Sequence, residues 1–121
     1  VKLSKEREEV RVVDDEFLTP TYTAEIAAQI HAIIHSNLPN GVYHVTAEGS
    51  CSWYDFAHEI FNLTKSDVVL NRAKPGEFSV KVNRPKYSVL ENRGLKAQGI
   101  NQMSHWKIGL KTYIEKKYPA I

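Results

Sequence analysis

Residues 52–61 read Ser-Trp-Tyr-Asp-Phe-Ala-His-Glu-Ile-Phe and predict the beginning of an amphipathic helix. The side-chain oxygen of Ser52 can accept a hydrogen bond from the amide of Asp55, and the Asp55 carboxylate can reach back to the amide of Ser52. Behind this capping box, apolar side chains recur at helical spacing and are expected to be buried on one face: Trp53, Phe56, Ala57, Ile60 and Phe61. We therefore expect a helix that packs against a core.

Two more main helices are expected on either side of this one. The first follows Thr23, which can cap it, and ends before Leu38-Pro-Asn-Gly41. Its buried stripe is expected to be Ile26, Ala27, Ile30, Ile33 and Ile34. The last helix is expected to start at Ser104 and to bury Trp106, Leu110, Tyr113 and Ile114. A short helix is also expected within residues 88–97, before Gly99.

Three short strands are expected at residues 9–13, 42–46 and 68–70, where β-branched and apolar side chains concentrate. Strands that alternate with helices indicate an α/β fold, and residues 1–121 are long enough for a single domain. Three strands this short cannot form a well-covered sheet. We therefore expect the chain, which opens without methionine in a charged segment, to be a piece of a longer protein that supplies the missing sheet.

The composition is that of an ordinary soluble domain, with 42% hydrophobic and 25% charged residues. No apolar run approaches the ~18 residues of a membrane helix, so we expect no membrane association. A single cysteine, Cys51, excludes an internal disulfide and favours a reducing, cytoplasmic location. Residues 72–121 carry eleven basic and three acidic side chains, a balance that could serve an anionic partner. The basic residues are not interleaved with aromatic ones in a known module, so a nucleic-acid partner is not expected.

The sequence lacks the motifs of a cofactor site or a catalytic centre. Its six glycines never fall at the spacing that brings a backbone close to a dinucleotide pyrophosphate, and no phosphate-binding loop is present. Tyr113 and Lys117 have the Tyr-x-x-x-Lys spacing of reductases, but Tyr113 falls on the apolar stripe of the last helix, which favours core packing. His31 and His35 have no third ligand nearby in the sequence, and Cys51 is interpreted as a small buried residue at a helix entrance.

Five segments in order resemble the C-terminal part of the dTDP-4-dehydrorhamnose reductase family, which belongs to the extended short-chain dehydrogenases/reductases. They are Val12-Val-Asp-Asp-Glu-Phe-Leu-Thr-Pro-Thr-Tyr-Thr23, Gly41-Val-Tyr-His-Val-Thr46, Gly49-Ser-Cys-Ser-Trp-Tyr-Asp-Phe-Ala57, Arg84-Pro-Lys-Tyr-Ser-Val-Leu90 and His105-Trp106. The resemblance covers about residues 10–114. The acidic loop departs from the family pattern at Glu16 and at Leu18-Thr19, where glutamine and a Gly-Ser pair are expected.

The resemblance implies a C-terminal substrate-binding subdomain with three main helices and short strands. The N-terminal Rossmann domain of the parent would hold NADPH, or alternatively NADH, together with the catalytic Tyr-x-x-x-Lys. The parent would reduce the C4 ketone of dTDP-4-dehydro-β-L-rhamnose in the last step of dTDP-L-rhamnose synthesis. No catalytic residue, cofactor or metal ligand is therefore assigned to this chain. Its implied partners are the nucleotide sugar, the Rossmann domain of its own chain and, as an open case, a second copy in a homodimer.

Arg84 is the first candidate for substrate binding. An Arg-Pro in this region of the superfamily lies near the substrate diphosphate, and a guanidinium matches phosphate oxygens in a two-pronged hydrogen bond. The Pro-Thr-Tyr-Thr loop, with Thr21 and Tyr22, is the second candidate because it leads into a helix whose N-terminal amides favour anions. Tyr87 and Ser88 could add hydroxyl contacts. For Arg84 the competing interpretation is a surface ion pair, and for the others it is packing or turn formation.

Two other functions stay open at this point. A related nucleotide-sugar epimerase or dehydratase would usually show an Arg-Asp-Tyr type of entry to the helix at Thr23, where this chain has Pro20-Thr-Tyr22. A non-catalytic relative, of the type of the regulatory subunit of methionine adenosyltransferase, shares the same architecture. The tyrosine and lysine expected upstream of Val1 would separate a catalyst from such a relative.

Overall fold

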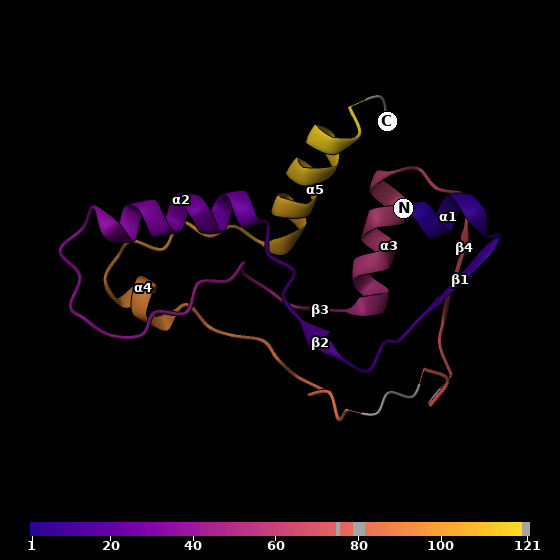
Figure 1. The fold of residues 1–121 in the computed structure, drawn as a ribbon, viewed down its shortest axis with the longest axis horizontal. Helices are drawn as coiled ribbons and strands as arrows, with labels where there is room; N and C mark the ends of the chain where they lie inside the picture. Colours follow the sequence, from indigo (N-terminus) through magenta and orange to yellow (C-terminus); the bar gives the residue numbers. More distant parts are fainter. Residues whose placement is uncertain (75, 79–81, 120–121) are drawn as a thin grey trace.

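The computed structural model describes residues 1–74, 76–78 and 82–119. In chain order its elements are α1 (Lys2–Glu6), β1 (Glu9–Val12), β2 (Phe17–Leu18), α2 (Thr23–Ile34), β3 (Cys51–Ser52), α3 (Trp53–Leu63), β4 (Val69–Arg72), α4 (Arg93–Ala97) and α5 (Trp106–Lys117). Figure 1 shows α3 and α5 next to each other, with α1, β1 and β4 beyond α3 and with α2 and α4 beyond α5. The expected α/β fold with three main helices and short strands is confirmed.

Two small sheets hold the N-terminal part of the chain. Strands β1 and β4 pair in parallel, with Glu9 opposite Val69 and Val12 opposite Arg72. Strands β2 and β3 pair antiparallel, with Phe17 opposite Ser52. The expected strands at residues 9–13 and 68–70 are thus confirmed within one or two residues. Each sheet has only two strands within the described residues, as the scarcity of strand-forming segments predicted.

The core lies where α3 and α5 meet. Its buried members are Ala47, Cys51, Trp106, Leu110 and Ile114, and partly buried apolar side chains from α3 pack against them. The predicted capping box is present, because Ser52 Oγ accepts from the Asp55 amide at 3.0 Å and Asp55 Oδ2 accepts from the Ser52 amide at 3.1 Å. The cap fixes the direction of α3 immediately after β3, so the helix leaves the small sheet toward α5.

Helix α2 does not bury the stripe that the sequence predicted. Ile30 is 45% exposed and Ile34 is 72% exposed, whereas Gln29 is fully buried. The Gln29 side chain donates to the Ile100 carbonyl at 2.9 Å and accepts from the Gln102 amide at 2.6 Å. The helix therefore packs against the backbone of an irregular segment, and a polar side chain serves that contact better than an isoleucine would. The N-cap is Tyr22 rather than Thr23, and it makes no side-chain capping bond.

Two other expectations were wrong, and the start of the last helix was expected two residues too early. Residues 42–46 form no strand, because the backbone of Thr46 is hydrogen-bonded by the side chain of Asn92 instead of by a neighbouring strand. Trp53 is 38% exposed and is not a core anchor, although Trp106 at 4% exposure is. Helix α5 begins at Trp106, since His105 supplies the cap by accepting from the Lys107 amide. In the described part of the chain, no helix is both long and apolar enough to cross a membrane.

Candidate substrate-side site

The segment that carries Arg84, Tyr87 and Ser88 is fastened to β2. The Phe17 amide donates to the Lys86 carbonyl at 2.8 Å, and the Ser88 amide donates to the Phe17 carbonyl at 2.9 Å. These two bonds make a parallel bridge between Phe17 and Tyr87. Ser88 Oγ also donates to the Phe17 carbonyl, at 3.3 Å, so its hydroxyl is already engaged within the fold. Tyr87 remains 67% exposed.

Two cations of this segment differ in their partners. Lys86 Nζ lies 2.7 Å from Asp15 Oδ2, and this hydrogen bond lowers the pKa of Asp15 and raises the pKa of Lys86. Arg84 is exposed and forms no ion pair or hydrogen bond with any residue that the structure describes. The surface ion pair that competed with a binding role is therefore not seen for Arg84.

Thr21 and Tyr22 follow β2 in the chain, and both take part in packing. Thr21 Oγ1 accepts from the Ala47 amide at 3.1 Å and lies 3.2 Å from the Thr46 hydroxyl. The ring of Tyr22 meets that of Tyr113 edge to face, with centroids 5.9 Å apart. These contacts match the competing interpretation of packing and turn formation for Thr21. The hydroxyl of Tyr22 makes no hydrogen bond within the described residues.

A cavity of about 210 Å³ opens beside Tyr22. It lies between the 20–23 turn and the facing surfaces of α3 and α5, and its lining includes Phe56, Trp106 and Tyr113. The four predicted site residues other than Arg84 thus fall into two groups. Tyr87 and Ser88 sit directly against β2, whereas Thr21 and Tyr22 face α5 and residues 46–47. No hydrogen bond joins the two groups in the described chain.

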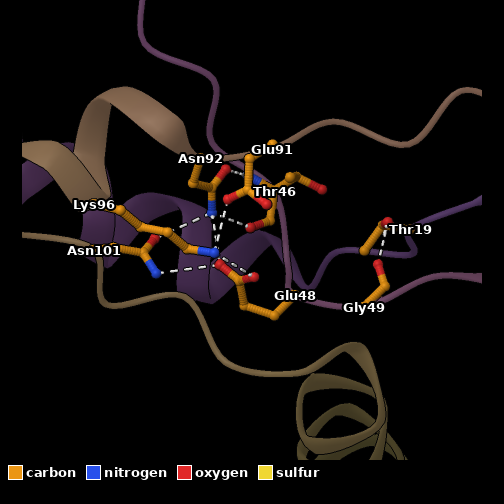
Figure 2. A network of polar contacts seen from close by, with 8 residues as sticks. All are labelled: Thr19, Thr46, Glu48, Gly49, Glu91, Asn92, Lys96 and Asn101. Atoms are coloured by element: carbon orange, nitrogen blue, oxygen red, sulfur yellow. Dashed lines mark hydrogen bonds and ion pairs between the residues drawn. The ribbon is translucent and has the colours of Figure 1, made fainter.

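A polar network centred on Asn92 holds Thr46 and Glu48 in place (Figure 2). The sequence analysis did not predict this network. Asn92 Nδ2 donates to the Thr46 carbonyl at 2.6 Å, and Asn92 Oδ1 accepts from the Thr46 amide at 3.0 Å. The same nitrogen approaches Asn101 Oδ1 at 3.1 Å, and Asn101 in turn donates to Glu48 at 3.2 Å. Lys96 completes the network by pairing with Glu48 at 3.0 Å and with Glu91 at 2.7 Å.

The residue that follows this network in the chain contacts the turn at Pro20. Gly49, which follows Glu48, accepts a hydrogen bond from Thr19 Oγ1 at 2.7 Å on its carbonyl. Gly49 has a φ of +81°, and an added Cβ would lie 2.5 Å from Nε2 and 2.8 Å from Cδ2 of the His105 ring, so only glycine fits there. The turn is therefore positioned from two sides. Asn92 directly precedes α4, where asparagine is a common cap, but its side chain makes no capping hydrogen bond and bonds the backbone of Thr46 instead.

Among the described residues, the other chemical groups considered from the sequence are not arranged as a catalytic centre. Cys51 is 3% exposed, and burial, followed by the nearby Asp55 carboxylate, raises its pKa to about 11. Tyr113 is 38% exposed rather than in the core, and its hydroxyl accepts from Lys117 at 3.1 Å on the surface of α5. The rings of His31 and His35 stack, with centroids 4.1 Å apart. No group of three or more metal-ligating side chains occurs among the residues described here.

Comparison with known proteins places this arrangement in a family. Residues 1–118 match the RmlD substrate binding domain. The chain is 34% identical over 120 residues to the spore coat polysaccharide biosynthesis protein SpsK of Bacillus subtilis (strain 168), covering 99% of this chain and 41% of that protein. The chain therefore spans about two fifths of the length of the curated relatives it matches.

Solved structures give the same result. A dTDP-4-dehydrorhamnose reductase ortholog from Clostridium acetobutylicum ATCC 824 superposes with a TM-score of 0.90 at 40% identity, over 96% of this chain and 41% of that one. The dTDP-4-dehydrorhamnose reductase of Bacillus anthracis str. Ames, solved in complex with NADP, superposes with a TM-score of 0.85 at 39% identity, over 95% of this chain and 40% of that one. The fold of this chain thus matches the C-terminal part of such structures.

Proposed function

The chain belongs to the RmlD substrate binding domain family, and on this basis we propose that it is the nucleotide-sugar-binding domain of a dTDP-4-dehydrorhamnose reductase. In this proposal residues 1–121 form the C-terminal domain of a longer protein. A Rossmann domain upstream would hold NADPH and the catalytic tyrosine and lysine. The NADP bound by the Bacillus anthracis relative supports the choice of cofactor. The buried, unpaired Cys51 is consistent with a reducing compartment such as the cytoplasm.

The observation that best supports the proposal is the exposure of Arg84 and its lack of a partner among the described residues. A guanidinium is always charged and presents several donors in a plane, which suits a diphosphate. Arg84 is exposed with no partner among the described residues, while the backbone that follows it is fixed to β2 by two hydrogen bonds. Its neighbour Lys86 is neutralised by Asp15. Arg84 is therefore an exposed cation without a partner among the described residues, two residues before the part of the segment that is bonded to β2.

Tyr22, Thr21, Tyr87 and Ser88 take secondary parts in this proposal. The hydroxyls of Thr21 and Ser88 already serve the fold, so we assign them to holding the backbone in place. Tyr22 and Tyr87 keep hydroxyls that make no hydrogen bond within the described chain, and either could contact the ligand. The other two functions considered from the sequence, an epimerase or dehydratase and a regulatory relative, have no specific observation in their favour.

The experiment that tests the proposal is a titration of dTDP-rhamnose, the product of the reaction, into the longer protein. Removing a charged hydrogen bond to phosphate should cost about 1.5–3 kcal/mol, or about ten- to a hundredfold in affinity. We expect that loss for Arg84→Ala. The matched control is Arg93→Ala, an exposed arginine on α4, which should bind as the wild type does. An Arg84→Ala protein with unchanged affinity would rule out the assigned role.

A further inference from the structure

Two exposed aromatic residues pair directly through their backbones at the bridge between β2 and the 84–88 segment. Phe17 and Tyr87 are direct partners in the parallel bridge. Directly paired residues of a ladder place their side chains on the same face of the sheet. Phe17 is 40% exposed and Tyr87 is 67% exposed. Two aromatic side chains are therefore accessible to solvent from adjacent ladder positions.

The pair is held in place by backbone bonds and not by loose loop structure. The carbonyl and the amide of Phe17 are both bonded to the segment around Tyr87, at 2.9 and 2.8 Å. On its other side, Phe17 is paired with Ser52, which caps α3. A backbone anchored in this way loses little further conformational freedom when a ligand stacks on the rings, and that lowers the entropic cost of binding.

Arg84 lies within reach of the same place. It precedes Tyr87 by three residues, and three extended residues span at most about 10 Å. That length is comparable with the distance from a pyrimidine ring to the terminal phosphate of its nucleoside diphosphate. Lys86, between the two, is directed to Asp15 at 2.7 Å and does not compete for this place. The segment thus offers an exposed aromatic side chain at one end and, at the other, a guanidinium without a partner among the described residues.

We propose that Phe17 and Tyr87 form the stacking site for the base of the nucleotide, while Arg84 binds its diphosphate. This inference rests on the proposed function and adds the part of the ligand that each end of the segment would recognise. Every base offers a π face, so aromatic side chains can bind it without hydrogen bonds to its edges. Stacking on one aromatic side chain changes affinity by about five- to a hundredfold.

The test is calorimetric titration of dTDP and of inorganic pyrophosphate into the longer protein. We expect Phe17→Leu and Tyr87→Leu each to weaken dTDP binding about five- to a hundredfold. Tyr87→Phe, which keeps the ring, should bind dTDP as the wild type does. Ile108→Ala, which trims an apolar side chain 58% exposed on α5, is the matched control and should be without effect. Pyrophosphate binding should be unchanged in both leucine variants and reduced in Arg84→Ala.

The outcomes separate this inference from the proposed function. If Arg84→Ala weakens dTDP binding and both leucine variants bind dTDP normally, the stacking site is refuted and the proposed function stands. If the wild-type protein binds neither dTDP nor pyrophosphate, the proposed function itself fails. Leucine variants that lower the Tm without changing dTDP affinity would show that another part of the longer protein covers these rings, which also refutes the stacking site. Affinity for NADPH, measured on each variant, identifies a loss caused by general unfolding.

Discussion

Replacement of Asn92 by alanine should destabilise the fold strongly, although a residue that only precedes a five-residue helix would be expected to have a small effect. Asn92 is 1% exposed and hydrogen-bonds both the amide and the carbonyl of Thr46, at 3.0 and 2.6 Å. Thr46 is 8% exposed, so neither group can turn to bulk water when the asparagine side chain is removed. Asn92→Ala therefore leaves one buried donor and one buried acceptor without partners.

The size of the effect follows from those two groups. Each buried polar group left without a hydrogen bond costs about 1–3 kcal/mol. A water molecule entering the vacated space would satisfy part of this, so we expect a total loss of about 3–4 kcal/mol. Small domains are stable by only about 5–15 kcal/mol, which makes such a loss easy to measure. Urea unfolding of the 121-residue chain, followed by the fluorescence of its tryptophans, would give the free energy of unfolding.

The control for this experiment is Asn37→Ala, which removes an exposed asparagine after α2 and should change stability by less than about 0.5 kcal/mol. Two buried groups without partners should together cost at least about 2 kcal/mol. A free energy of unfolding of Asn92→Ala within about 1 kcal/mol of the wild-type value would therefore contradict this explanation. It would mean that residues 42–46 are held in place by something other than the Asn92 side chain.

Two further predictions concern close packing and a buried thiol. An alanine Cβ at Gly109 would lie 3.1 Å from Tyr22 Cβ and would collide with the Glu25 carboxylate. Overpacking of about 1–3 kcal/mol should outweigh the roughly 1 kcal/mol by which alanine favours a helix, so the urea midpoint should fall. Gly41→Ala, with open space around it, is the control and should leave the midpoint unchanged. Burial raises the pKa of Cys51 to about 11. Its thiol should therefore resist a thiol reagent at pH 8 until urea unfolds the chain, and fast labelling of the native protein would contradict that.

The raised pKa of Cys51 also sets a pH dependence. The folded protein keeps the proton that the unfolded chain releases more readily, because the folded pKa of about 11 lies above the ordinary value of 9.0. The contribution of the neutral thiol to stability is therefore complete below pH 9 and is lost as the pH rises toward 11. This loss at alkaline pH should disappear in a Cys51→Ala protein, and a persistent loss would assign it to other groups.

Local signals in the sequence were sufficient for the elements whose cause is local. The capping box at Ser52 and Asp55 needs only residues within one turn of helix, and it is present as predicted. The strands at residues 9–12 and 69–72 follow from short runs of strand-forming residues. The candidate role of Arg84 came from a family resemblance, and the structure adds that its guanidinium has no partner among the described residues.

Contacts between distant segments could not be predicted. The isoleucines of α2 have helical spacing, but the spacing does not say which face meets the rest of the chain, and Gln29 occupies the buried face. The 42–46 segment has the composition of a strand, yet its partner is a side chain 46 residues away. The pairing of Phe17 with Tyr87 likewise joins residues far apart in the sequence. In each case the contact is made by a residue distant in the sequence, so the residues around the affected position do not reveal it.

The most direct test of the central claim is NADPH oxidation by the longer protein with dTDP-4-dehydrorhamnose as the substrate. We predict turnover by the longer protein, reduced by Arg84→Ala through a raised KM, and none by the 121-residue chain alone. A folded longer protein that binds NADPH but does not oxidise it with this substrate would contradict the account and would favour an epimerase, a dehydratase or a regulatory relative.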